Sequence, residues 1–185
     1  MLYQEAVDYL DSLNKLGSVP GLDSIRELLH RLGNPQNLTR YVHVAGTNGK
    51  GSTCQMLSRV LTESGYKTGL FISPYITDFC ERIQINNELV DRQVLADAVS
   101  YMTPILDKLN DDGIIITEFE FLTAVSFYIY KKLGCDIIVC ETGLGGLLDS
   151  TNLIKTPLCS VITKIDLDHT AILGDTIEEI AVQKC

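Results

Sequence analysis

One segment, residues 41–64, constrains the fold of this chain more than any other. A strand-like apolar run at residues 41–45 leads into a glycine-rich turn at residues 46–52, and a helix-like run from Thr53 to Ser64 follows. Backbone N–H groups at the start of a helix have no partner inside the helix, and the helix dipole is positive at that end. The segment therefore predicts an anion site between a strand and a helix.

The side chains of this turn indicate which anion it holds. Lys50 adds a mobile positive charge for phosphate oxygens, and Ser52 places a hydroxyl where a phosphate-bound Mg²⁺ takes an oxygen ligand. The usual GxxxxGK[ST] spacing is not kept, because Val44 stands at the first glycine position and Gly51 separates Lys50 from Ser52. We interpret the turn as a nucleoside-triphosphate loop, the alternative being an ordinary glycine-rich turn.

The apolar pattern predicts an α/β fold with a mostly parallel, doubly wound sheet of the P-loop type. Strand-like runs at residues 41–45, 67–72, 136–140 and 158–163 are continuously apolar and alternate with helix-like segments. Such strands belong to a parallel sheet that is covered on both faces. Residues 82–90 alternate like a hairpin, which we expect as a small insertion.

Ligands of parallel α/β sheets sit beyond the carboxyl ends of the strands. The phosphate loop, Ser73, Glu141 and residues 166–169 each directly follow a predicted strand, so we expect them to meet at one rim. Glu141 is either a Mg²⁺ ligand, direct or through water, or a solvated strand-end acid. Ser73 could offer a hydroxyl to a second metal or belong to a plain turn. His169 could be a ligand or a structural hydrogen-bonding residue, since hard cations prefer oxygen.

Composition narrows the class of protein. With 185 residues and a net charge of −9, the chain fits one domain that offers no basic stripe to nucleic acid or an anionic membrane. The N-terminus lacks a secretory signal, and no apolar stretch is long enough to span a membrane. The six cysteines include no C-x-x-C pair, and Cys140 and Cys159 fall in strand-like runs where we expect burial. These features are typical of a cytoplasmic enzyme domain.

Several separated motifs follow one another in a fixed order along the chain. They are residues 20–22 (PGL), 32–35 (LGNP), 43–53 (HVAGTNGKGST), 70–74 (LFISP), 81–83 (ERI), 117–123 (TEFEFLT), 141–146 (ETGLGG), 148–152 (LDSTN) and 168–170 (DHT). Together they resemble the folylpolyglutamate synthase/dihydrofolate synthase family, within the Mur-type ATP-dependent ligases. The resemblance covers essentially the whole chain.

The resemblance implies a ligase that uses ATP to phosphorylate a carboxylate of folate or pteroate, after which the amine of L-glutamate attacks the acyl phosphate. Lys50, Glu141 and His169 would carry the catalysis, and Thr117, Phe119 and Asp149 would line the pterin pocket, with residues 21–25 beside it. Lys184 matches a lysine that the family carbamylates. By the same resemblance, ATP would be held by Thr47, Asn48, Gly49, Lys50, Gly51, Ser52 and Thr53, and Mg²⁺ by Ser52, Ser73, Glu141 and His169.

Two departures from the family bear on these expectations. Leu147 stands where the family usually has arginine after the paired glycines, which affects substrate-anion contacts or interdomain closure. Family members also continue into a C-terminal domain that binds glutamate. We therefore interpret residues 1–185 as the N-terminal ATP-binding domain of a ligase that is monomeric at full length, and expect the isolated fragment to be inactive.

Two other functions remain open at this point. One is a Mur-type ligase of peptidoglycan precursor synthesis, and the other is a nucleotide-binding regulatory domain that does not ligate. The second lacks the guanine-reading Asn-Lys-x-Asp signature, because residues 163–166 read TKID. The sequence does not choose between dihydrofolate synthesis and polyglutamate extension.

Overall fold

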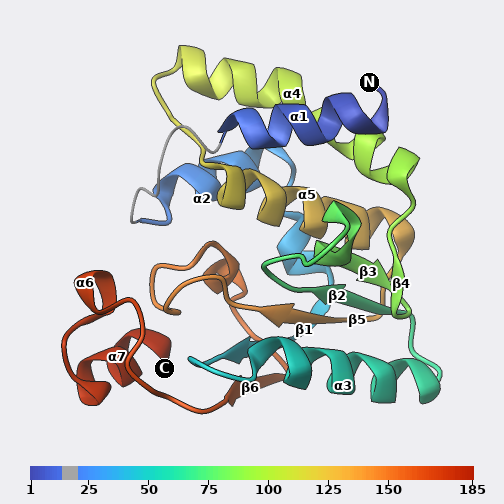
Figure 1. The fold of residues 1–185 in the computed structure, drawn as a ribbon. Coiled ribbons are helices and arrows are strands. Elements are labelled where there is room, and N and C mark those ends of the chain that lie inside the picture. Colours follow the sequence, from blue (N-terminus) through green and yellow to red (C-terminus); the bar gives the residue numbers. More distant parts are fainter. Residues whose placement is uncertain (14–20) are drawn as a thin grey trace.

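A six-stranded sheet organises the described part of the chain, residues 1–13 and 21–185 of a computed structural model (Figure 1). Pro20, the first residue of one motif, lies outside these residues. The strand order is β4-β3-β2-β5-β1-β6, with β2, β5, β1 and β6 parallel and the β3–β4 hairpin antiparallel. This confirms the mostly parallel sheet and its hairpin insertion. The strands are β1 (Arg40–Ala45), β2 (Thr68–Phe71), β3 (Ile83–Ile85), β4 (Glu88–Leu89), β5 (Ile137–Glu141) and β6 (Cys159–Ile162).

Helices cover the two faces of the sheet unequally (Figure 1). Helix α3 (Lys50–Glu63) packs on one face, against β1, β2 and β5. On the other face lies α5 (Glu118–Leu133), and α1 (Tyr3–Leu13), α2 (Asp23–Arg31) and α4 (Arg92–Asp111) pack on α5 from outside. The shorter elements are η2 (Pro35–Leu38), η3 (Phe79–Arg82), η4 (Ser150–Leu153), α6 (Thr170–Leu173) and α7 (Ile177–Lys184).

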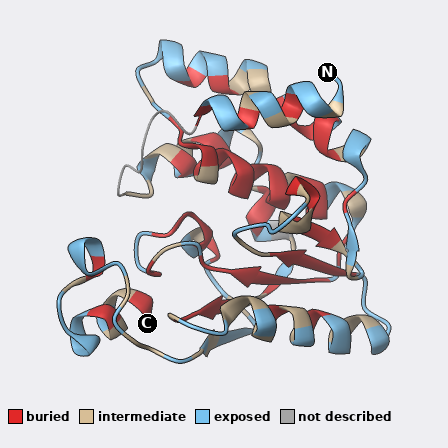
Figure 2. Cartoon of the chain, viewed as in Figure 1, coloured by how far each residue is buried: buried red, intermediate tan, exposed pale blue. Residues whose placement is uncertain are grey.

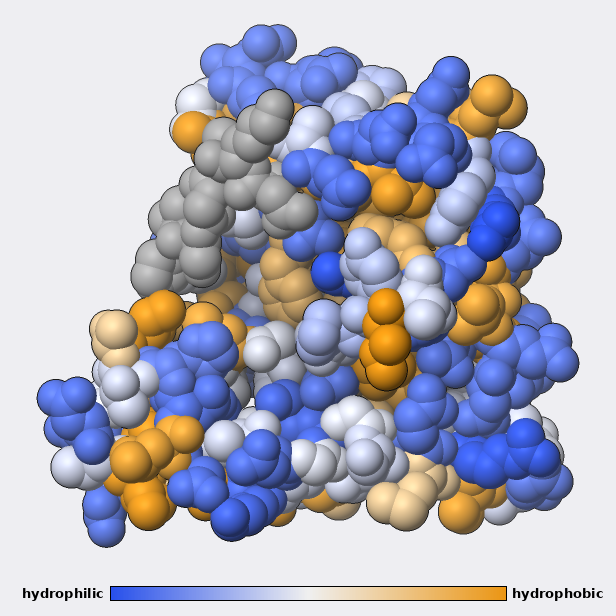
Figure 3. Space-filling view, in the orientation of Figure 1, coloured by the Kyte–Doolittle hydropathy of each residue, from blue (hydrophilic) through white to orange (hydrophobic). Residues whose placement is uncertain are grey.

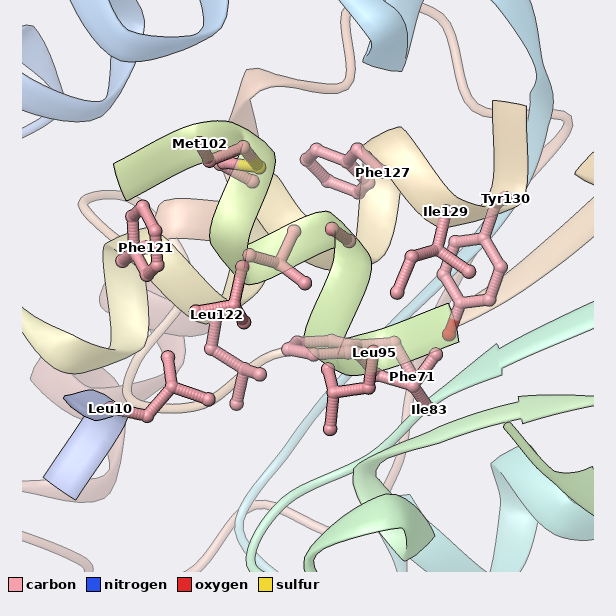
Figure 4. Packing of buried hydrophobic residues seen from close by; sticks show 14 of the residues in the cluster. Leu10, Phe71, Ile83, Leu95, Met102, Phe121, Leu122, Phe127, Ile129 and Tyr130 are labelled. Carbon is pink, nitrogen blue, oxygen red and sulfur yellow. The ribbon is translucent and has the colours of Figure 1, made fainter. Parts of the chain in front are cut away.

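Helix α5 is the centre of the main hydrophobic core. It is buried around most of its circumference, as Figure 2 shows, which is typical of a helix that lies between a sheet and outer helices. Figure 4 shows Phe121 and Leu122 packed with Leu10 of α1 and Met102 of α4. A second, smaller core lies under α3 and contains Val44, Cys54, Leu70 and Val139.

Local signals explain where the helices begin. The Asp91 side chain accepts from the N–H groups of Gln93 and Val94 and so caps the start of α4. Thr117 and Glu120 form a capping box at the start of α5. Helix α3 begins at Lys50 and not at Thr53, because Gly49 adopts a left-handed φ of 82° and caps the helix there. Lys50 and the two residues after it therefore belong to the first helical turn.

The sheet is less covered at β6 than the apolar pattern predicted. Cys140 on β5 is fully buried, but Cys159 on β6 is exposed, so the expectation of burial was wrong for Cys159. The reason is position: β6 is the edge strand of the described sheet, with β1 as its neighbour. None of the helices within residues 1–13 and 21–185 combines the length and the apolar character that a membrane span requires.

We expect Gly69→Ala to destabilise the fold by about 1–3 kcal/mol, the usual cost of overpacking a core. A Cβ at Gly69 would lie 2.7 Å from Cδ1 of Tyr130, whose hydroxyl donates to the Leu70 carbonyl and whose side chain is fully buried. Urea unfolding of the single variants and of Gly69→Ala/Tyr130→Leu measures the coupling. Smaller destabilisation by Gly69→Ala in the Tyr130→Leu background is expected, and equal destabilisation would contradict the account.

Candidate functional site

The phosphate loop is held in shape by the segment that follows β6. The N–H groups of Thr47 and Asn48 donate to the Lys164 carbonyl over 2.9 and 3.3 Å. The Thr47 hydroxyl donates to the Asp166 carbonyl and accepts from the Asp166 N–H. These backbone and hydroxyl groups of Thr47 and Asn48 therefore serve to hold the loop in shape. Gly46 is required here, because a Cβ on it would collide with Thr163.

The start of α3 presents the groups that suit an anion. The N–H groups of Gly51 and Ser52 lie in the first turn, where an α-helix has no internal acceptor for them. The Lys50 ammonium folds back over the loop, with its Nζ 3.4 Å from the Thr47 carbonyl oxygen. Thr53 donates its hydroxyl to the Gly49 carbonyl and so fastens the turn. Amides, helix dipole and one cation converge at this point.

Glu141 lies directly beside this helix start, at the carboxyl end of β5. It is buried, and its Oε2 accepts from the Ser73 N–H over 3.2 Å. A Cβ on Gly51 would lie 3.6 Å from the same oxygen, so the helix start and the carboxylate are neighbours. Burial raises the pKa of Glu141, and the Lys50 charge opposes that rise. A buried carboxylate with few donors suits a bound cation, so the site fits Mg²⁺.

Lys184 connects the phosphate loop to the loop after β6. Its ammonium donates to the Gly46 carbonyl and to Asp168 Oδ2, each over 3.0 Å, and the residue is 4% exposed. A lysine on such a helix is usually exposed, but Lys184 is buried. His169 follows Asp168 with a left-handed φ of 44°, and its Nε2 lies 3.5 Å from Asp168 Oδ1.

The predicted rim residues thus form two connected groups. Lys50, Ser73 and Glu141 meet at the start of α3, whereas His169 is joined to the loop through Asp168 and Lys184 and has a mainly exposed side chain. The described residues include no cluster of three or more His, Cys, Asp or Glu placed to hold a metal ion.

A cavity of about 420 Å³ opens beside the glycine-rich loop that follows β5. Thr117, Phe119 and Asp149 line it, as does Gly21 of the 21–25 segment. The sequence-predicted pocket residues are thus brought together, and the cavity wall also includes Glu120, which caps α5 together with Thr117.

Internal contacts fix the shape of the cavity wall. Thr117 donates its hydroxyl to Glu120 Oε2 over 2.8 Å, so its hydroxyl proton serves the helix cap. The Phe119 ring packs against Phe71 with centroids 6.0 Å apart, and it lies so close to Gly143 that a Cβ there would collide with it. Asp149 Oδ2 accepts from the N–H groups of Gly143 and of the residue after it, which folds the glycine-rich loop over its carboxylate.

Two polar residues below this wall, His43 and Thr151, fall in motifs of the sequence but were assigned no role from it. His43 Nε2 lies 2.7 Å from Thr151 Oγ1, which contacts Asp149. The available signal was a histidine inside an otherwise apolar strand, which by itself does not reveal its partner. Their contact spans more than a hundred positions of sequence, so only the folded sheet brings them together.

A parallel sheet with an anion-binding helix start next to a buried carboxylate defines a mononucleotide-binding α/β domain. Comparisons with known proteins narrow the class. The chain is 43% identical over 186 residues to folylpolyglutamate synthase of Lacticaseibacillus casei, with 100% of the chain and 43% of the relative covered. It is 44% identical over 184 residues to dihydrofolate synthase/folylpolyglutamate synthase of Bacillus subtilis, with 98% and 43% covered.

A solved structure described as an FPGS–AMPPCP–folate complex superimposes with a TM-score of 0.94 at 43% identity, covering 100% of this chain and 45% of that one. No family model matches the chain. The chain belongs to the folylpolyglutamate synthase/dihydrofolate synthase family, and it spans a little under half the length of the relatives it matches.

We expect Lys184→Met to destabilise the fold by roughly 3 kcal/mol, because it leaves Asp168 without its buried partner. Lys164→Met is the matched control, since Lys164 also pairs with an aspartate but is mostly exposed, and its loss is expected to cost less than about 1 kcal/mol. Urea unfolding and hydrogen exchange at residues 46–52 are the measurements. Equal effects of the two variants would contradict a buried bridge at Lys184.

Proposed function

We propose that this chain is the nucleotide-binding part of an ATP-dependent ligase that joins L-glutamate to folate, to dihydropteroate or to both. The observation that carries the proposal is the placement of Lys50 and the α3 start beside the buried Glu141, next to the cavity that Thr117, Phe119 and Asp149 line. The names of the relatives, and the AMPPCP and folate named for the similar structure, support it.

The proposed reaction has two steps. A carboxylate oxygen of the pterin substrate attacks the γ-phosphorus of ATP, and the bond from that phosphorus to the β–γ bridging oxygen breaks to release ADP. The glutamate amine then attacks the acyl carbon, an amide C–N bond forms, and phosphate leaves while the amine loses a proton. Phosphoryl transfer of this kind needs alignment and charge neutralisation more than a protein nucleophile.

The residues of the phosphate loop would hold and align the triphosphate. The first-turn N–H groups of Gly51 and Ser52 would donate to phosphate oxygens, and Lys50 would follow the transferred group. Gly49 caps the helix, while Thr47, Asn48 and Thr53 keep the turn in shape. Bound Mg²⁺ would neutralise phosphate charge, held by Glu141 with the Ser52 and Ser73 hydroxyls and with His169.

The cavity would receive the pterin ring, with Phe119 and the glycine-rich loop as its walls. Leu147 lies on this loop, where the family usually has arginine, and it is half exposed. Its apolar side chain offers no cation to a substrate anion. We keep Lys184 as the proposed carbamylated lysine. Carbamylation would put an anion beside Asp168, which needs a cation such as Mg²⁺ between them.

The complete enzyme is proposed to be longer than this chain. The chain spans less than half of its relatives, and apolar surface gathers over the α6–α7 region in Figure 3. Exposed apolar side chains there are Leu167, Ile172, Ile177 and Val182. A glutamate-binding domain would cover such a surface. The six cysteines are free thiols, which supports a cytoplasmic location, and a monomer without nucleic-acid partners is proposed.

Lys50→Ala in the full-length ligase is expected to reduce ligation at least about 100-fold, the usual cost of removing one donor from a developing anion. The measurement is glutamylated product from ATP, L-glutamate and either dihydropteroate or tetrahydrofolate. Lys155→Ala, at an exposed lysine away from the loop, is the control and should retain activity. Full turnover of Lys50→Ala would remove Lys50 from the site.

The same assay separates the alternative functions. Product formed only with a peptidoglycan precursor as acceptor would favour a Mur-type ligase of cell-wall synthesis. Nucleotide binding with no product from any acceptor would favour a regulatory domain. Product from dihydropteroate, tetrahydrofolate or both decides which glutamate addition the enzyme performs.

Glu141→Gln is expected to raise the Mg²⁺ concentration needed for half-maximal activity at least about tenfold, because the amide keeps the shape and the Ser73 contact but lacks the charge. His169→Ala is expected to act in the same direction. Activity is measured against Mg²⁺ at saturating ATP. A variant whose Mg²⁺ requirement equals that of the wild type does not carry a metal ligand at the substituted position.

A further inference from the structure

A chain of hydrogen bonds runs from the half-buried His43 on β1 to the buried polar groups of the cavity wall. His43 Nε2 lies 2.7 Å from Thr151 Oγ1, and the Thr151 hydroxyl donates to Asp149 Oδ1 over 2.5 Å. Thr151 is fully buried and Asp149 is 5% exposed. His43 lies on β1, three positions before the glycine that opens the phosphate loop. The chain therefore links the nucleotide strand to the substrate cavity.

The direction of each hydrogen bond follows from the chemistry of the groups. A carboxylate accepts only, so Thr151 must give its single hydroxyl proton to Asp149. The hydroxyl oxygen can then only accept from His43, which makes Nε2 the protonated nitrogen of the imidazole. Burial lowers the pKa of His43, which favours the neutral ring. The result is an ordered relay of donors that ends on Asp149.

The Asp149 carboxylate uses all its acceptor positions to hold the cavity wall in shape. Its Oδ1 accepts from the N–H and the hydroxyl of Thr151, and its Oδ2 accepts from the N–H groups of Gly143 and Leu144. These four donors match the acceptor capacity of a carboxylate. The Phe119 ring lies against Gly143, so the orientation of Asp149 also decides where the aromatic wall of the cavity stands.

We propose that His43 is a positioning residue for the substrate cavity: through Thr151 it fixes the Asp149 carboxylate and with it the glycine-rich loop. The expected effect on binding of the pterin substrate rests on the proposed function. Because β1 is paired on both sides, His43↔Cys140 on β5 and His43↔Ser160 on β6, its backbone is held independently of its side chain. Loss of the imidazole therefore acts on the pterin side of the site and not on ATP.

His43→Phe keeps an aromatic ring and removes the donor, whereas His43→Gln places an N–H donor where Nε2 lay. In the full-length ligase, we expect His43→Phe to raise KM for the pterin substrate about five- to tenfold, the equivalent of one buried hydrogen bond, with KM for ATP within about twofold of wild type. His43→Gln should restore most of the loss. A rise in both KM values, or no rise in either, would overturn the proposal.

A double-variant comparison separates the relay from a general packing role. Thr151→Val removes the hydroxyl through which His43 acts, so His43→Phe should add little to KM in the Thr151→Val background. Thr151→Ser, which keeps the hydroxyl, is the matched control. Fully additive effects would mean that His43 acts by packing alone, and the positioning role would be wrong.

Amide hydrogen exchange, which needs no enzymatic turnover, tests the role of His43 independently of the proposed function. In the chain itself, amide exchange of Gly143 and Leu144 reports directly on their bonds to Asp149. We expect His43→Phe to speed exchange of these two amides and His43→Gln to leave it near the wild-type rate. Unchanged exchange in His43→Phe contradicts the relay even if the ligase activity is found, whereas faster exchange supports the relay even if no ligation is found.

Discussion

The parallel pairing of β2, β5, β1 and β6 is the constraint on which the site depends, because it brings the carboxyl ends of distant strands to one edge. Glu141 ends β5 and the phosphate loop leaves β1, and the register pairs Val44 with Glu141 directly. The pairing therefore places the buried acid beside the start of α3, and the Ser73 N–H donates to its carboxylate. Lys184 and Asp168 complete the edge from the β6 side.

The end of β5 serves both halves of the site. Glu141 belongs to the phosphate side, and two residues later Gly143 begins the wall of the cavity, held by Asp149 and pressed against Phe119. A glycine is required because the ring occupies the space that a side chain would fill. Glu141 and the cavity wall are thus only two residues apart along the chain, which suits the phosphoryl transfer that we propose between the two sides.

Prediction from sequence succeeded where the signal was local. Continuous apolar runs predicted the strands of the parallel sheet, and the alternating run at residues 82–90 predicted its hairpin. It failed where long-range packing decides: Cys159 is exposed because β6 is an edge, and His43 finds Thr151 only across the folded sheet. The loop, Glu141 and the cavity residues were predictable as motifs, but their hydrogen bonds were not.

The most direct test of the central claim is a crystal structure of the chain with Mg²⁺ and a non-hydrolysable ATP analogue. We predict the triphosphate at the first-turn amides of α3, with Lys50 on its terminal phosphate and the metal ion between that phosphate and Glu141. A nucleotide bound elsewhere, or a metal ion remote from Glu141, would contradict it.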